Sequence, residues 1–332
     1  MGRAGIRFAK NSIAYTDPID DLLKEHISLQ REFSVEIALK PKSFQEEGFG
    51  FIFLIHGGRD RSQFLIGQWG SSLIVMNGDD YDHHRKTKRI SFKSTSAIPE
   101  IHLMTVTTDM EGSRIYIDGR LVKRRKDLRL GIPDGKTARL LLGNSIYGRH
   151  PWDGEICGVA VYGSALSQKD IEAHSRAFFK NQRLPLLNQP APFILFPLDE
   201  KGGTRAKNYP GGAHYLHIPS DMKILSPLFF FRGQLRSMLK RSIFTNQDAV
   251  LNFFGFIPLG ILLSATLIRL GGGNERHAIV VTLLTGFFIS LFIETVQAWM
   301  PDRSSDIQDL ILNTVGTFIG AVTARYFTKV QG

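Results

Sequence analysis

Carboxylate and amide side chains recur at helical spacing inside otherwise apolar stretches of the C-terminal third of the chain. In the first stretch, Asp248 and Asn252 lie four residues apart, on one face of a helix. In the second, Ser290, Glu294 and Gln297 follow one stripe. The remaining polar residues precede or enter a third stretch: Arg303, Asp306, Asp309 and Asn313. Clustered carboxylates can act as general acid and base or hold a divalent cation, and an arginine can bind a phosphate.

Three apolar runs must position these groups, at about residues 249–268, 277–298 and 307–327. Each has roughly the 20 residues that a helix needs to cross a bilayer. Spans joined by short loops alternate in direction, so the start of the first, the end of the second and the start of the third lie on one side. Because a carboxylate facing lipid is costly, we expect the polar stripes to meet inside a three-helix bundle.

The spacing of these residues resembles the VanZ-like membrane family. The pattern reads D-x3-N-x3-F-x-P-x-G, then I-E-x2-Q, then R-x2-D-x2-D-x3-N-x2-G-x3-G. Beyond the polar residues already named, it falls on Phe256, Pro258, Gly260, Ile293, Gly316 and Gly320. The family takes its name from an association with glycopeptide-antibiotic resistance. The resemblance therefore implies a bacterial multi-pass membrane protein, but it supplies no reaction.

Two interpretations of the polar residues stay open at this point. In the first, they hydrogen-bond between helices or hold a lipid headgroup, and Gly316-x3-Gly320 marks a close helix contact. In the second, the clustered carboxylates belong to an intramembrane enzyme or carrier that acts on a lipid-linked phosphate or sugar. The chain has no nucleophile motif and no Gly-rich phosphate loop, so an enzymatic role is the less favoured of the two.

The first half of the chain reads as short strands closed by turns. Residues 32–41 alternate apolar and polar side chains, as a half-buried strand does. The Asp118-Gly119 pair between apolar runs is typical of a tight hairpin. About ten such strands, followed by one helix at 167–178 with Ser167 as its N-cap, predict an all-β sandwich.

Several of these strands resemble the laminin-G/concanavalin A-like jelly roll. They are GIRFAKNSIAYTD, FSVEIALKP, H-x-MTVTTD-x3-SRIYIDG and W-x-GEICGVAVYGSALS, within roughly residues 5–178. Members of that family commonly bind sugars or glycosylated partners, sometimes through calcium. The resemblance implies a lectin-like head that binds a glycan or a cell-wall polymer.

One loop of the predicted sandwich is rich in metal-binding side chains. Within residues 77–84 these are Asn77, Asp79, Asp80, Asp82, His83 and His84. Their oxygens suit calcium and the histidine pair suits a transition metal, although Asn-Gly-Asp-Asp is also the composition of a plain hairpin loop. Trp69, Trp152 and Tyr81 are candidates for stacking on a sugar ring, with burial in the core as the alternative.

Charge is distributed unevenly between the two halves. From residue 242 onward five Lys/Arg face six Asp/Glu, so the net charge of +10 leaves +11 for residues 1–241. Such a surplus suits anionic lipid headgroups or wall polymers, and without a nucleic-acid motif it does not indicate nucleic-acid binding. Six of the basic residues are expected on an exposed strand edge, where charge blocks pairing with other chains: Arg120, Lys123, Arg124, Arg125, Lys126 and Arg129.

The predicted organisation has three parts. Residues 1–200 form the sandwich, 201–241 a linker with an amphipathic segment that lies in the headgroup layer, and 242–332 the membrane domain. The sandwich and the polar cluster are expected on the same side of the membrane. Family resemblance favours the extracytoplasmic side. Because the first residues do not read as a signal peptide, either the start is incomplete or the sandwich stays in the cytoplasm.

Overall fold

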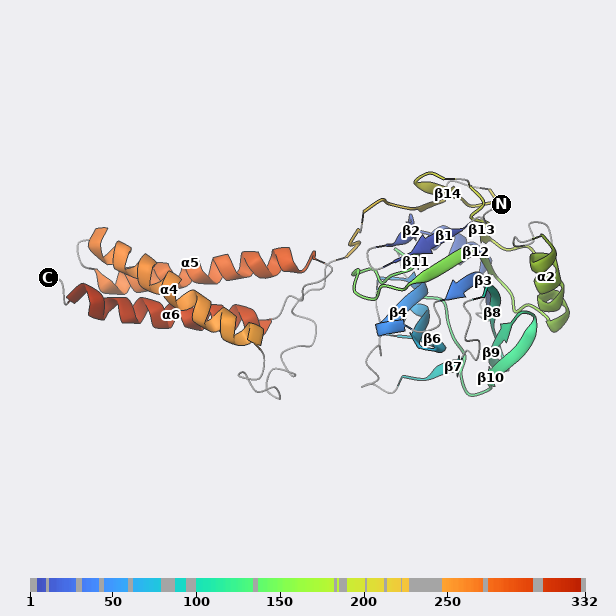
Figure 1. The fold of residues 1–332 in the computed structure, drawn as a ribbon, viewed down its shortest axis with the longest axis horizontal. Coiled ribbons are helices and arrows are strands. Elements are labelled where there is room, and N and C mark those ends of the chain that lie inside the picture. Colours follow the sequence, from blue (N-terminus) through green and yellow to red (C-terminus); the bar gives the residue numbers. More distant parts are fainter. Residues whose placement is uncertain are drawn as a thin grey trace. The chain divides into compact units, whose positions relative to one another are not determined.

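A computed structural model of the 332-residue chain separates into two compact units, Met1–Leu225 and Ser226–Gly332, which we describe one at a time. The structure describes residues 5–9, 12–27, 32–41, 45–58, 62–78, 87–93, 100–133, 137–181, 184, 190–200, 202–211, 214–221, 223–226, 247–270, 274–300 and 307–329. The first unit is a sandwich of two antiparallel sheets, and the second contains three long helices (Figure 1).

One sheet of the sandwich has seven strands, ordered β1-β12-β3-β8-β9-β10, with β13 also pairing with β12. Their bounds are β1 (Ile6–Phe8), β12 (Gly154–Tyr162), β13 (Ile194–Phe196), β3 (Phe33–Pro41), β8 (His102–Asp109), β9 (Gly112–Ile117) and β10 (Arg120–Arg125). We call it sheet A. Strands β1 and β13 pair with different parts of β12, at residues 154–156 and 159–161.

The second sheet, sheet B, has eight strands, ordered β14-β15-β2-β11-β4-β5-β6-β7. They are β14 (Arg205–Lys207), β15 (Tyr215–His217), β2 (Ala14–Thr16), β11 (Arg139–Leu142), β4 (Gln45–His56), β5 (Phe64–Gly70), β6 (Ser72–Asn77) and β7 (Arg89–Lys93). Strands β4 to β7 form a meander, so each pairs with the next one along the chain.

The main core lies between the two sheets. The predicted inward face of β3 is confirmed, because Phe33, Val35, Ile37 and Leu39 are all fully buried in the main core cluster. The prediction of a half-buried strand is wrong, because Ser34, Glu36 and Ala38 on the other face are fully buried as well, where the helix of residues 168–181 covers sheet A. The hairpin turn between β9 and β10 is confirmed as well. Asp118 and Gly119 have φ angles of 53° and 84°, which only a few residue types adopt at low cost.

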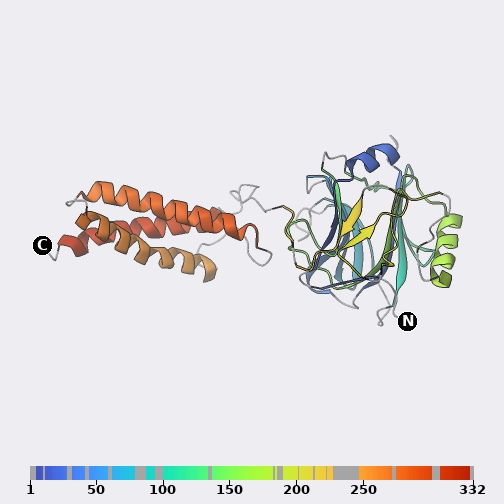
Figure 2. The ribbon, with the colours of Figure 1, turned by 90° about the horizontal axis from the view of Figure 1, so that it is seen from above.

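Two helices accompany the sheets, α1 (Asp20–His26) and α2 (Gln168–Asn181). Helix α2 lies against the outer face of sheet A (Figure 2). It begins with the expected cap, in which the Ser167 and Asp170 side chains each accept a hydrogen bond from the backbone N–H of the other. Ile171 and Phe178 of α2 pack with Cys157 in a second apolar cluster.

The sandwich extends beyond residue 200, into the stretch for which the sequence indicates a linker. Strand β15 pairs with β2 through Leu216↔Thr16 and His217↔Tyr15, and β14 pairs with β15. Strands of three residues are too short to show an alternating pattern, which explains why they were not predicted. Most of the predicted interfacial segment, from residue 227 to 241, lies outside the described residues.

The second unit contains α4 (Gln247–Leu270), α5 (Glu275–Gln297) and α6 (Ile307–Lys329). Each contains a stretch that is long and apolar enough to cross a membrane: Val250–Leu270, Glu275–Gln297 and Ile307–Tyr326. The three predicted spans are thus confirmed, and the chain is a membrane protein with a β-sandwich ahead of its spans.

Candidate functional site

Glycines bring the middle parts of α4 and α6 together. A Cβ added at Gly316 would lie 2.3 Å from the Phe253 carbonyl oxygen, and one added at Gly320 would lie 2.1 Å from that of Ile257. Gly260 of α4 makes the same close approach to Thr317. The paired residue numbers rise together, so the two helices run parallel with their backbones in direct contact.

Helix α5 runs antiparallel to them and adds its polar stripe at the end of the bundle where α6 begins. The Asn313 Nδ2 donates a hydrogen bond to Ser290 Oγ at 2.9 Å. Glu294 lies one turn beyond Ser290 on α5 and is only 1% exposed. Ile307 and Leu310 of α6 pack on the same end of α5. The expected meeting of polar stripes from separate spans is therefore present for the second and third helices.

The Asn313 side chain uses only part of its hydrogen-bonding capacity. It is 2% exposed, and its Oδ1 has no hydrogen-bond partner among the described residues. The neighbouring Thr317 hydroxyl donates to the Asn313 backbone carbonyl, not to its side chain. A buried amide oxygen without a donor is costly, so this acceptor is suited to a polar group brought by a ligand.

The predicted membrane residues differ in burial, and some of them lie outside the described part of the chain. Glu294 and Asn313 are buried inside the bundle. Asn252, Gln297 and Asp309 are half-buried. Three others cannot be placed, because Arg303, Asp306 and the side chain of Asp248 lie outside the described part.

Two further polar contacts join the helices, and the sequence did not indicate either of them. Ser264 of α4 donates a hydrogen bond to the Ala321 carbonyl at 3.2 Å. Toward the far end of the bundle, Arg325 Nε lies 2.8 Å from Glu275 Oε2. Both contacts join helices outside the polar cluster. They therefore serve as examples of polar contacts that contribute only to helix packing.

In the sandwich, the Asn77 side chain forms hydrogen bonds with backbone groups of neighbouring segments. Its Nδ2 donates to the carbonyls of Gln63 and Gly131, and its Oδ1 accepts from the Gly131 N–H at 2.8 Å. The side chain thus fastens the end of β6 to a neighbouring loop. The other predicted ligands, Asp79, Asp80 and Asp82, lie outside the described residues, and the described part holds no group of three or more metal-binding side chains.

The candidate sugar-stacking aromatics differ in exposure. Trp152 is fully buried, and its Nε1 donates to Gln68 Oε1 at 2.8 Å, so it belongs to the core. Trp69 is 41% exposed, and its ring lies 6.4 Å from that of Phe49. Tyr81 lies outside the described residues. Among the described candidates, Trp69 is therefore the one that is exposed to solvent.

A buried polar cluster that sequence reasoning missed lies between sheet A and α2. The Glu36 carboxylate accepts from the Tyr162 hydroxyl at 2.8 Å and lies 3.0 Å from His174 Nδ1. Thr105 donates to the other Glu36 oxygen at 3.2 Å. Burial and the neighbouring carboxylate raise the pKa of Tyr162 far above its usual range. Because these residues lie far apart in the sequence, local patterns give no sign of the cluster.

Comparison with known proteins identifies both parts of the chain. Residues 20–172 match the profile of the concanavalin A-like lectin/glucanases superfamily, and residues 193–328 match that of the VanZ/LLP1 family. The second match begins at β13, so it includes three strands of the sandwich as well as the three spans. No curated protein matches the chain.

Solved structures resemble the sandwich at low sequence identity. A Bacteroides ovatus protein described as carbohydrate-binding aligns with 65% of this chain and 58% of its own, at 14% identity and a TM-score of 0.46. Botulinum neurotoxin type C aligns with 50% of this chain and 42% of its own, at 15% identity and a TM-score of 0.38. NanB sialidase from Streptococcus pneumoniae aligns with 51% of this chain and 27% of its own, at 14% identity and a TM-score of 0.40.

The chain thus spans less than two thirds of the length of each of these proteins. The chain thus combines a β-sandwich, of which residues 20–172 match the concanavalin A-like lectin/glucanases superfamily, with residues 193–328, which match the VanZ/LLP1 family and include the membrane spans.

Proposed function

We propose that the protein is a membrane-anchored glycan-binding protein of the bacterial cell envelope. The observation that carries this proposal is an exposed aromatic ring on a concanavalin A-like sandwich that precedes three membrane spans. The sandwich would supply recognition, and the spans would keep the recognised polymer at the membrane.

The glycan site would lie at Trp69, on the outer face of sheet B. Trp69 pairs with Ser72 of β6, and Ser72 pairs with Lys93 of β7. Residues directly opposite each other on neighbouring strands share a face of the sheet, so an aromatic ring, a hydroxyl and an exposed ammonium group form one row. A ring for stacking, flanked by polar groups for sugar hydroxyls or a sugar carboxylate, is a suitable arrangement for an oligosaccharide.

A glycan array probed with the full chain in nanodiscs tests this site. We expect binding that Trp69→Ala reduces at least tenfold and that Tyr209→Ala, a change at another exposed aromatic, leaves intact. Parallel arrays with calcium and with a chelator test the predicted calcium dependence. If the protein binds no sugar on the array, or if the two variants lose binding equally, the proposal is contradicted.

For the membrane region, the proposal is that the cluster of Ser290, Glu294 and Asn313 binds a polar group from a lipid or a lipid-linked sugar. Its support is a fully buried carboxyl one helical turn from Ser290, and a buried Asn313 amide oxygen that accepts no hydrogen bond from the described residues. The alternative of an intramembrane enzyme or carrier uses the same residues, and the carboxyl of Glu294 would then take or give a proton.

Growth of a strain that depends on the protein, with and without a glycopeptide antibiotic, separates a functional site from helix packing. Glu294→Gln keeps the shape of the side chain but removes its charge, and we expect loss of growth at normal protein level. Ser264→Ala is the matched control, because it removes an interhelical hydrogen bond outside the cluster. If both variants grow like the wild type, the cluster contributes only to helix packing, and the proposal of a binding site is wrong.

We further propose that the sandwich faces the extracytoplasmic side. The family resemblance supports this orientation. Because the native Cys157 is buried, Lys169→Cys places a reactive thiol on exposed α2. Labelling of intact cells by a membrane-impermeant maleimide is expected, and labelling only after lysis would place the sandwich in the cytoplasm.

A further inference from the structure

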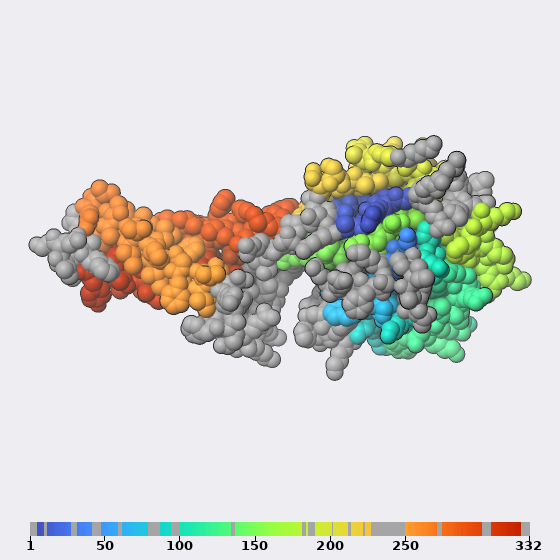
Figure 3. Space-filling view, in the orientation of Figure 1, coloured from blue at the N-terminus to red at the C-terminus, as the bar shows by residue number. Residues whose placement is uncertain are grey.

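The hairpin of β9 and β10 forms an unusually exposed edge of the sandwich. Strand β10 is the last strand of sheet A, and five of its six residues are exposed. In the space-filling view, the blue-green surface of this region is open to solvent (Figure 3). Within this hairpin and its two ends, we define the basic edge as three exposed cationic residues and three exposed apolar ones: Met110, Arg120, Leu121, Val122, Lys123 and Lys126.

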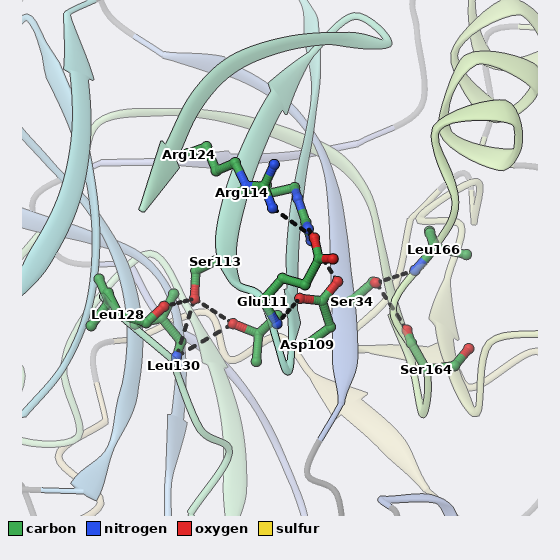
Figure 4. A network of polar contacts seen from close by, with 11 residues as sticks. Ser34, Asp109, Glu111, Ser113, Arg114, Arg124, Leu128, Leu130, Ser164 and Leu166 are labelled. Carbon is green, nitrogen blue, oxygen red and sulfur yellow. Dashed lines mark hydrogen bonds and ion pairs between the residues drawn. The ribbon is translucent and has the colours of Figure 1, made fainter. Parts of the chain in front are cut away.

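The acidic residues around the basic edge are already paired. Glu111 lies between Arg114 and Arg124, with its Oε2 at 2.7 Å and 2.6 Å from their guanidinium nitrogens (Figure 4). Asp109 pairs with Arg114 as well. The two remaining carboxylates also have cationic partners: Asp118 with His102, and Asp127 with Arg125 and Lys88.

Three cations of the basic edge are left over. Arg120, Lys123 and Lys126 are exposed and have no ion-pair partner among the described residues. Charged side chains on an edge strand can serve only to prevent pairing with other strands. Here three cationic side chains without an ion-pair partner among the described residues lie on one hairpin. They produce a local positive potential that attracts an anionic partner.

Large apolar side chains interrupt these charges. Met110 is 65% exposed, Leu121 49% and Val122 41%. Exposed apolar residues among cations are characteristic of surfaces that bind lipid headgroups, because the apolar groups enter the boundary of the acyl layer while the cations contact phosphates. A soluble polyanion would use the cations and leave the apolar side chains in water.

We propose that the basic edge docks onto anionic lipid headgroups of the membrane in which the chain is anchored. Only about 20 residues separate Leu225 from Gln247, the first residue of α4, so the sandwich is tethered to the membrane that holds the spans. A tether of this kind gives the surface a high effective concentration, and three cations with three apolar anchors then suffice for docking. The contact would set the orientation of the sandwich on the bilayer.

Lysine reactivity in nanodiscs tests the proposal on the full chain. The chain is placed in discs of phosphatidylcholine alone or mixed with phosphatidylglycerol, and acetylation is quantified by mass spectrometry. We expect Lys123 and Lys126 to react at least threefold more slowly in the anionic discs, and high salt to remove the difference. The exposed Lys169 and Lys180 of α2 are internal controls. Equal reactivity of Lys123 and Lys126 in both discs would overturn the proposal.

Amide hydrogen exchange of residues 119–126 tests the same contact with matched variants. Protection in anionic discs should persist in Lys169→Glu/Lys180→Glu and disappear in Lys123→Glu/Lys126→Glu, two variants with the same change of net charge. Long-chain polyphosphate added to neutral discs tests the alternative that the basic edge binds a soluble polyanion. Protection by polyphosphate without protection by phosphatidylglycerol would identify a soluble polyanion as the partner and refute membrane docking.

Discussion

The two units of the chain have opposite interiors. In the sandwich the largest side chains are inside, with Trp152, Tyr162 and Phe33 fully buried. In the helical unit small residues are inside, such as Ala321 and Thr317, and large ones lie outside. The large exposed side chains include Leu262, Phe288 and Phe292, which are at least 60% exposed.

The difference follows from the solvent of each unit. Burial of apolar surface drives the sandwich to fold in water, so its core contains the bulkiest groups. Between helices in lipid that driving force is absent, and close backbone packing and interhelical hydrogen bonds replace it. Inside the sandwich, the Glu36 carboxylate is hydrogen-bonded within an apolar core, whereas polar groups in the bundle are part of what joins the helices.

The largest effect is expected for Glu36→Ala in the sandwich. The change leaves the Tyr162 hydroxyl and His174 Nδ1 without their buried acceptor and should destabilise the head by about 3–5 kcal/mol. Near-UV circular dichroism during thermal unfolding of the full chain measures it. Glu25→Ala, at an exposed carboxylate, is the control, and a similar small shift for both would mean that the cluster adds little.

In the bundle, Gly320→Ala should cost about 1–3 kcal/mol, because the new Cβ would lie 2.1 Å from the Ile257 carbonyl and force α4 and α6 apart. Gly255→Ala is the matched control, since a Cβ there meets nothing within 4 Å and improves helix propensity. Resistance to unfolding by sodium dodecyl sulfate in mixed micelles measures both. Equal effects would show that the α4–α6 contact is not tight.

A smaller, pH-dependent effect is expected at His102. The hydrogen bond to Asp118 raises the pKa of His102, against the effect of burial. A raised pKa in the folded state stabilises the sandwich below the unfolded value of about 6.5, and the gain disappears as pH rises through the folded value. At this partly exposed pair the gain stays within about 1 kcal/mol.

The variant His102→Gln should therefore flatten the stability of the sandwich between about pH 6 and 8. Denaturant titrations at several pH values measure it. An unchanged slope of stability against pH in the variant would contradict this assignment.

The smallest effect is expected between Ser290 and Asn313. Their hydrogen bond joins α5 to α6, and such bonds in membranes contribute on average about 0.6 kcal/mol. A double-mutant cycle of Ser290→Ala and Asn313→Ala, in the mixed-micelle assay, isolates this coupling. A coupling near zero would mean that the two side chains do not interact in the folded bundle.

Much of the fold could be predicted, because it depends on local patterns. The inward face of β3 and the positive φ angles of Asp118-Gly119 are confirmed, and so are the three spans. The additional strands β14 and β15 could not be predicted, since three residues carry no period and β15 finds its partner β2 about two hundred residues earlier in the chain.

For the candidate membrane site, the sequence by itself determined which residues are polar and which helix face they occupy. Both follow from composition and from spacing along one helix. Only the tertiary structure decided that Asn313 meets Ser290 and that Gly316 and Gly320 contact α4. The same is true, in the sandwich, of the contact between Glu36 of β3 and His174 of α2. Contacts of this kind join segments that are distant in the chain, so they depend on how complete helices and sheets pack, which no local pattern records.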